Sequence, residues 1–151
     1  MLGDQVRYNR TDLLLEHPLI KKWQEENRLV PVCPEVAGGM PVPRAPAEIV
    51  GGNAEAILLN KAIVMDNSGK NVSAEFIQGA HHALALAQEN NCVAAILTER
   101  SPSCGSQQVY DGSFSGKRKT GMGVTAALLQ ANNIQVFNQH QLKNLFEAFF
   151  K

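Results

Sequence analysis

The chain has 151 residues, a length that suits one domain with an ordinary hydrophobic core. Hydrophobic residues make up 44% of it and charged residues 19%, a composition that excludes a disordered chain. Because 14 basic residues balance 14 acidic ones, the sequence lacks the excess positive charge that binding to nucleic-acid backbones requires. We expect one domain over residues 1–151. Nucleic acid is disfavoured as a partner, and a small nucleobase is still allowed as a ligand.

The cysteine content and the apolar runs indicate a compartment. The longest apolar run, at 92–97, is far too short to span a bilayer, and no secretory signal is visible. The sequence has three cysteines, an odd number without the spacing of a disulfide framework. This favours free thiols or metal ligands in a reducing environment. We therefore expect a cytoplasmic protein without a membrane partner.

Helix and strand patterns alternate along the chain. Proline at the first helical position, Pro18, predicts a helix start, and Ser73 is a good N-cap for a longer helix. Two long loops, at 33–52 and 98–122, interrupt the pattern, and the proline and glycine of the first predict neither regular helix nor central strand there. The predicted elements are helix 18–27, strand 29–32, strand 62–65, helix 73–90, strand 92–97, helix 124–130, strand 134–137 and helix 139–150.

This alternation predicts an α/β fold: a three-layer, Rossmann-like, mostly parallel sheet with helices on both faces. Ligands of such sheets bind at the carboxyl ends of the strands. Cys33 directly follows the strand predicted at 29–32, and Cys104 lies in the loop after the strand predicted at 92–97. We therefore expect these two cysteines to lie close together at one edge of the sheet.

The residues around these two cysteines allow more than one interpretation. Cys33 and Cys104 are either thiolate ligands of a metal or iron–sulfur cluster, or two unrelated free thiols. Glu35 is either a general acid or base beside them, or a solvated surface carboxylate. Ser101 either bonds a ligand or serves the turn. Cys92 begins an apolar strand and is predicted to be a small core residue.

Four strings then carry a resemblance. They are CPEVAGGMPVPRAPAEIVGG at 33–52, ERSPSCGS at 99–106, YDGSFSGK at 110–117 and GMGVTAALL at 121–129. In order and over nearly the whole chain, they resemble the TudS thiouracil desulfidases. The resemblance implies a TudS-like α/β domain with a 4Fe-4S cluster held by three cysteines. One iron of that cluster is then open to the sulfur of a thiolated pyrimidine.

The same resemblance implies roles for individual residues. It implies Cys33 and Cys104 as cluster ligands, Glu35 as the catalytic acid/base and Ser101 as a catalytic serine. The implied reaction is non-redox: a thiolated uracil and water give uracil and hydrogen sulfide. Free thiouracil, a thiouridine nucleoside and a thiolated tRNA base share the reacting group, so all three stay open as substrates, although the neutral charge disfavours tRNA.

The first residues depart from the family pattern. In register, the first cluster cysteine would stand immediately before Met1, so the chain as given lacks the third ligand and the strand that carries it. We expect both to be encoded upstream of Met1, and we expect this chain to hold a cluster poorly. The alternative is a cluster-free, non-enzymatic remnant of the family that binds a small molecule or a partner.

Overall fold

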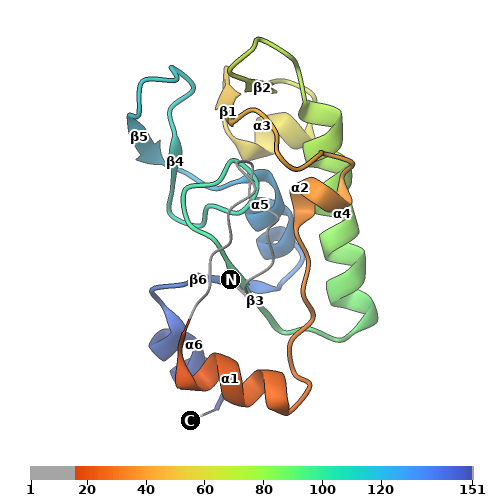
Figure 1. Cartoon of the computed structure of the whole chain (residues 1–151), viewed down its shortest axis with the longest axis vertical. Helices are drawn as coiled ribbons and strands as arrows, with labels where there is room; N and C mark the ends of the chain where they lie inside the picture. Colours follow the sequence, from red (N-terminus) through yellow and green to blue (C-terminus); the bar gives the residue numbers. More distant parts are fainter. Residues whose placement is uncertain (1–15, 151) are drawn as a thin grey trace.

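The structure, a computed structural model, describes residues 16–150 (Figure 1). Within this range, helices and short strands alternate as the sequence predicts. The helices are α1 (Pro18–Glu25), α2 (Pro34–Ala37), α3 (Ala54–Leu58), α4 (Ser73–Glu89), α5 (Val124–Ala131) and α6 (Leu142–Phe149). The strands are β1 (Ala47–Val50), β2 (Ile63–Asp66), β3 (Ala94–Leu97), β4 (Gln108–Tyr110), β5 (Arg118–Thr120) and β6 (Gln135–Asn138). The mixed α/β class is therefore confirmed.

The strands form small sheets. The described residues contain three two-stranded sheets, of which β3–β6 is parallel while β1–β2 and β4–β5 are antiparallel. The single, mostly parallel sheet predicted from the sequence is thus not seen in this part of the chain. The segment 29–32 forms no strand there, and Pro31 within it has no N–H to donate to a ladder.

The loop predicted to be irregular contains regular structure. Pro34 begins the one-turn helix α2, and Ala47 begins β1, which pairs with β2. The prediction that 33–52 excludes helix and central strand was wrong on the first point, because proline is well tolerated at a helix start. It holds on the second, since β1 has one partner among the described strands.

Helix α4 is the long central element. Its 17 residues begin at Ser73 as predicted, but Val72 occupies the N-cap position. The hydroxyl of Ser73 instead accepts a hydrogen bond from the Val64 N–H at 2.8 Å, which ties the helix to β2. Phe76 and Ala80 of this helix are buried against Ile49 of β1 and other residues of the largest core cluster. A tertiary contact has thus replaced the local cap.

The core is divided into three clusters along the molecule. At one end, α1 packs on α6 through Trp23 and Leu145; at the other end lie β1, β2 and α3 (Figure 1). Leu97 and Leu129 belong to the cluster between them, where α5 adjoins β3 and β6. None of the helices at 16–150 is long and apolar enough to cross a membrane.

Candidate functional site

Cys33 and Glu35 stand at the start of helix α2. Cys33 is the N-cap, with extended backbone angles (φ −109°, ψ 108°), and its side chain caps no main-chain group. This conformation is expected, because the residue before a proline is pushed away from helical angles. Pro34 is buried, while Cys33 and Glu35 on either side of it are half-buried. The thiol and the carboxylate are therefore presented by the same short turn.

Two glycines set the position of this turn. A β-carbon on Gly38 would lie 2.0 Å from the carbonyl oxygen of Glu75, and one on Gly79 would lie 1.9 Å from that of Pro34. Real β-carbons do not approach that closely, so the backbones of α2 and α4 touch where no side chain fits. The long helix α4 is thus the platform for the turn that carries Cys33 and Glu35.

Arg44 is the charged partner of Glu35. The guanidinium Nη2 lies 3.4 Å from Glu35 Oε2, and Nη1 donates a hydrogen bond to the carbonyl oxygen of Pro41 at 3.1 Å. Arg44 is 9% exposed, so the pair is largely withdrawn from water. A guanidinium held this way orients the carboxylate. Sequence reasoning did not single out Arg44, although it lies within the CPEVAGGMPVPR string.

Ser101 and Cys104 lie on a tight turn. The Ser101 hydroxyl oxygen accepts hydrogen bonds from the N–H groups of Ser103 and Cys104, both at 3.1 Å, and the Ser101 carbonyl accepts from the Gly105 N–H at 2.9 Å. Both interpretations of Ser101 therefore remain: the hydroxyl serves the turn with its oxygen, and its proton is still available to a neighbour.

Helix α5 holds the tip of this turn. The N–H groups of Val124 and Thr125 donate to the carbonyls of Pro102 (2.8 Å) and Ser103 (2.9 Å), and the Ser103 and Thr125 hydroxyls are 2.8 Å apart in a buried contact. A β-carbon on Gly123 would lie 2.3 Å from the Ser103 carbonyl carbon. Gly123 thus allows the turn to approach the start of α5 closely. The first N–H groups of this helix donate their hydrogen bonds to carbonyls of the turn.

The surroundings of Cys104 shift the pKa of its thiol. The pKa of its thiol is raised to about 12, first by withdrawal from water and then by the negative charges of Glu35 and Cys33, while hydrogen bonds involving Ser103 and Ser101 oppose the shift. Glu35 and Cys33 thus act electrostatically on a thiol that lies about 70 residues further along the chain. A thiol in such a place is neutral at pH 7 in the absence of a cation, and a coordinated metal reverses this preference.

Glu99 is a second residue that sequence reasoning missed. Its carboxylate accepts hydrogen bonds from the main-chain N–H groups of Ser106, Gln107 and Gln108, each at 3.0 Å, and from the Asn138 side chain at 2.7 Å. Burial by itself would raise the pKa of Glu99, but these bonds outweigh it and lower the pKa to about 2. The partners lie up to 39 residues away along the chain, so local sequence gives no signal of them.

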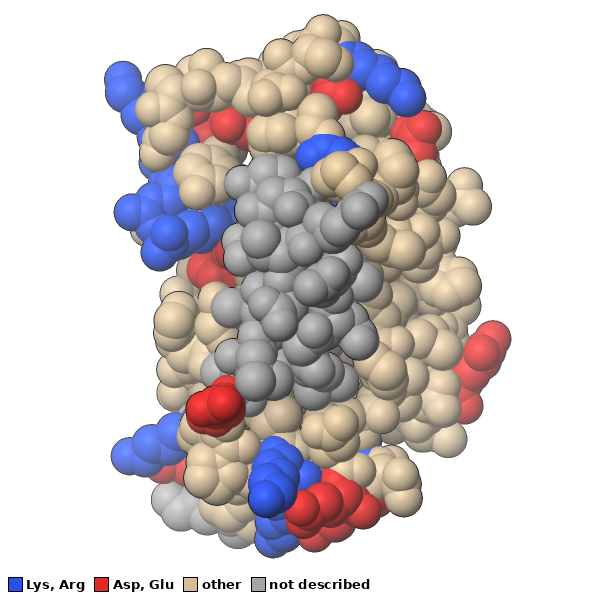
Figure 2. All heavy atoms as spheres, viewed as in Figure 1, with Lys and Arg blue, Asp and Glu red and all other residues tan. Residues whose placement is uncertain are grey.

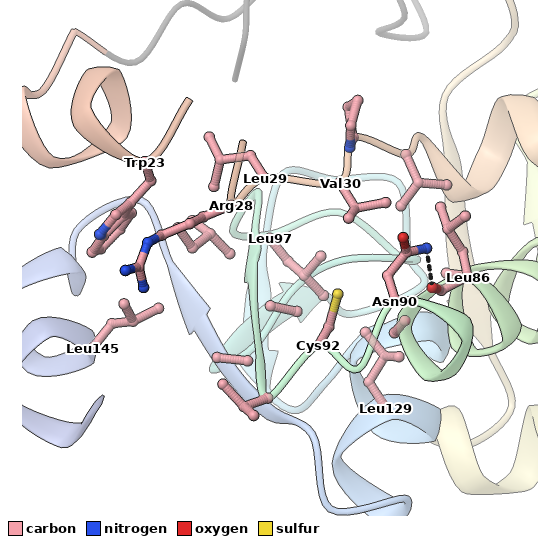
Figure 3. A pocket seen from close by; sticks show the side chains of 18 of the residues that line it. Trp23, Arg28, Leu29, Val30, Leu86, Asn90, Cys92, Leu97, Leu129 and Leu145 are labelled. Carbon is pink, nitrogen blue, oxygen red and sulfur yellow. Dashed lines mark hydrogen bonds between the residues drawn. The ribbon is translucent and has the colours of Figure 1, made fainter. Parts of the chain in front are cut away.

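A groove of about 720 Å³ runs from Cys33 towards the C-terminal helix (Figure 3). The extended segment 29–32 lines one side and β3 lines another, with Trp23 and Leu145 at its far end. Cys92 lies on the groove wall and is half-buried, not enclosed in a core. Cys33 lines the same groove.

The donor set of the site suits a soft metal centre in part. Cys33 and Cys104 carry thiol groups, and thiolates are the ligands that iron–sulfur clusters use. However, residues 16–150 contain no group of three or more His, Cys, Asp and Glu side chains that could hold a metal ion. Two of the described cysteines, Cys33 and Cys104, thus remain candidate ligands, and a three-ligand site is not formed by residues 16–150.

Comparison with known proteins decides the family. The profile of a family described as 2-thiouracil desulfurase matches residues 1–141. The chain belongs to this family. The Bacillus subtilis (strain 168) protein YbbK, itself uncharacterized, is 43% identical over 143 residues, which cover 95% of this chain and 93% of that protein. The resemblance inferred from the four strings is therefore confirmed.

A solved structure agrees with the family assignment. It is that of TudS, a 4Fe-4S-dependent thiouracil desulfidase, which is 41% identical. The match has a TM-score of 0.88 and covers 97% of this chain and 91% of that one. The fold of residues 16–150 is thus the fold of this desulfidase family.

Proposed function

We propose that this protein is an iron–sulfur-dependent desulfidase that converts a thiolated uracil to uracil and hydrogen sulfide. What supports the proposal is that the charges of Cys33 and Glu35 act on Cys104, from two loops some 70 residues apart, in a chain of the 2-thiouracil desulfurase family. The reaction balances without an oxidant or reductant: water supplies the oxygen of the new carbonyl and the two hydrogens of the sulfide.

In this proposal, Cys33 and Cys104 hold a 4Fe-4S cluster. Such a cluster, when bound through three cysteines, supplies an open Lewis-acidic iron with affinity for the sulfur of the substrate. The site needs reduced thiols, which suits the reducing cytoplasm.

The residues around the thiolates provide acid–base chemistry. The carboxylate of Glu35, paired with Arg44 at 3.4 Å, can take a proton from the water that attacks the thiocarbonyl carbon. The same group can return a proton to the departing sulfide. The hydroxyl of Ser101, whose oxygen is held by two main-chain N–H groups, can direct its own proton to the substrate ring.

The groove suggests how the sheet and the ligand set are completed. Among the described residues, β3 is paired on one edge only, with β6, and its other edge faces the groove opposite the segment 29–32. A strand placed between these two walls would make the sheet mostly parallel and three-layered, as the sequence predicts. Its end would lie near Cys33, where a cysteine could serve as the third ligand.

A second function follows from the same incomplete ligand set. A protein of this fold without a cluster would be a non-enzymatic binder of a small molecule or a partner. This alternative needs no three-ligand group, and residues 16–150 contain none. The two functions differ in one measurable property, the release of sulfide.

Surface charge supports a small substrate over a nucleic acid. Figure 2 shows Lys and Arg interspersed with Asp and Glu on the face that it displays. Lys117 and Arg118 are exposed at the start of β5, in a sequence whose net charge is zero. A broad basic surface, which backbone phosphates require, is not formed by the coloured residues of this face.

The test is reconstitution followed by turnover. The protein is incubated with iron and sulfide without oxygen, desalted, and supplied with 2-thiouracil, while uracil and sulfide are both measured. The desulfidase proposal predicts equal amounts of the two products in proportion to the iron bound. Iron-loaded protein that releases neither product would contradict it, and binding of thiouracil without conversion would support the alternative.

A further inference from the structure

The loop 100–105, which carries Ser101 and Cys104, is held at two places. Its tip rests on the first amides of α5, through the carbonyls of Pro102 and Ser103. Its base is closed by Glu99, the residue that immediately precedes it. The Glu99 carboxylate reaches across to the first residues after the loop, at 106–108.

All the contacts of this carboxylate are with hydrogen-bond donors. Oε1 accepts from the main-chain N–H groups of Ser106, Gln107 and Gln108 and, at 3.3 Å, from that of Arg100. Oε2 accepts from the Ser106 hydroxyl and from the Asn138 Nδ2, both at 2.7 Å. Only an ionised carboxylate offers acceptors in all these directions.

Asn138 extends this network to the sheet. It is 3% exposed at the end of β6, and its Oδ1 accepts a hydrogen bond from the His140 N–H at 2.9 Å. The side chain therefore cannot flip to present its oxygen to Glu99 without losing that bond. The network joins the ends of the paired strands β3 and β6 to the start of β4.

Arg100 shows that the loop is under constraint. It has a positive φ of 73°, a region in which residues with a β-carbon are uncommon. Among residues 16–150, Asn occupies four of the six non-glycine positions with positive φ, but Arg lacks the short polar side chain that makes Asn tolerant there. Such a conformation persists only where its surroundings over-determine it. Two contacts hold Arg100 in this conformation: its N–H donates to Glu99, and its backbone pairs with that of Val109.

We propose that Glu99 is a positioning residue: its carboxylate closes the base of the loop and thereby sets where Cys104 and Ser101 stand at the site. The inference rests on the proposed function for what Cys104 and Ser101 do. The positioning itself is a property of the metal-free chain. Glu99 acts through the loop and touches no reacting group.

Hydrogen exchange of the metal-free protein tests this placement directly. Glu99→Gln keeps one acceptor oxygen but turns an amino group towards Asn138, and Glu99→Ala removes every acceptor. Both variants are expected to speed amide exchange about tenfold or more at residues 106–108, whose N–H groups donate directly to Glu99. The deciding amides are those of Ser103 and Cys104, which bond Ser101 and not Glu99.

If Glu99 positions the loop, exchange at Ser103 and Cys104 also rises, severalfold in Glu99→Gln and more in Glu99→Ala, while the amides of Ala80 and Ala83 in α4 stay protected. If α5 alone positions the loop, only 106–108 respond, and the proposal is overturned. Asp66→Asn is the matched control. Asp66 also accepts two main-chain N–H bonds, from Ser68 and Lys70, but on β2. This variant should leave Ser103 and Cys104 unchanged.

The rate of 2-thiouracil turnover provides a second test of the positioning role. In cluster-loaded protein, Glu99→Gln is expected to lower 2-thiouracil turnover about tenfold or more, and Asp66→Asn is expected to leave it unchanged. If the exchange result is as expected but no preparation releases sulfide, the proposed function fails while the positioning role stands. Faster exchange at Ser103 and Cys104 combined with full turnover in Glu99→Gln would overturn the link to the site.

Discussion

Gly79 of α4 faces the carbonyl of Pro34 at a distance that no side chain could tolerate: a β-carbon on Gly79 would lie 1.9 Å from that oxygen. Gly38 makes the reciprocal approach to the α4 backbone, 2.0 Å from the Glu75 carbonyl. Both contacts involve main-chain atoms, which cannot rotate away. The turn that presents Cys33 and Glu35 is therefore positioned by backbone packing on α4.

Gly79→Ala should separate α2 from α4. The clash is expected to lower the free energy of unfolding by about 1–3 kcal/mol, even though alanine is the better helix former. Thiouracil turnover should fall more than stability implies, because Glu35 moves with the turn. Urea unfolding and turnover at saturating substrate measure the two effects. Gly121→Ala is the control, since its added β-carbon would meet only the Val109 side chain, at 3.4 Å. Unchanged turnover in a folded Gly79→Ala protein would contradict the role given to this contact.

Glu35→Gln should separate chemistry from cluster binding. The variant keeps the size of the side chain and leaves both thiols in place, so its iron content and cluster absorbance are expected to match those of the parent. Turnover should fall about 10²–10⁴-fold, the usual contribution of a general acid–base group. Full activity in this variant would remove Glu35 from the mechanism. Glu89→Gln, on the exposed end of α4, is the matched control.

Glu99 should make stability depend on acid pH. Its pKa is about 2 in the folded protein and 4.5 in the reference state, so the unfolded chain binds a proton first. Its contribution, about 2 kcal/mol after solvent screening, is complete above pH 4.5 and is lost as the pH falls towards 2. The difference in unfolding free energy between the parent and Glu99→Gln should therefore shrink over that range. A difference that stays constant from pH 5 to pH 2.5 would rule out this linkage.

Extending the chain upstream should restore a full ligand set. We predict that the chain as given binds iron weakly after anaerobic reconstitution. An added apolar strand that ends in cysteine just before Met1 should raise both iron per chain and the melting temperature. The strand would bury its faces in the groove beside β3, and its cysteine would supply the third thiolate. The same extension ending in serine is the control, which should gain stability but not iron. Equal iron in the short and extended chains would show that another residue already serves as the third ligand.

The regular helices and the buried strand could be predicted from the sequence because their signals are local. The apolar periodicity of α4 and the short apolar run of β3 place both elements within about two residues of where they lie. Strand β1 was missed because prolines and glycines surround it, and a strand forms only if a partner, here β2, is present. The segment 29–32 was predicted to be a strand but forms none, since the described residues offer it no strand to pair with.

In the candidate site, too, residues with a local sequence signal could be predicted and residues defined by tertiary contacts could not. Cys33, Glu35, Ser101 and Cys104 stand out as chemistry-bearing residues in unusual loops, and the charges of Cys33 and Glu35 raise the pKa of the Cys104 thiol. Their roles stay predictions. The structural roles of Arg44 and Glu99 could not be predicted from the sequence, because they depend on contacts that form only when the chain folds. The donors that surround Glu99 come from the end of β6 and the start of β4 as well as from its own loop.

The most direct test of the account compares the three cysteines. Cys33→Ser, Cys104→Ser and Cys92→Ser are prepared in the strand-extended chain and reconstituted side by side, and iron per chain and sulfide released from 2-thiouracil are measured for each. We predict that Cys33→Ser and Cys104→Ser lose both stable iron and sulfide release, because each removes a ligand. Cys92→Ser should match the parent, since the family resemblance assigns a ligand role to Cys33 and Cys104 and none to Cys92. Loss of iron and activity in Cys92→Ser, or their retention in Cys33→Ser or Cys104→Ser, would contradict the site described here.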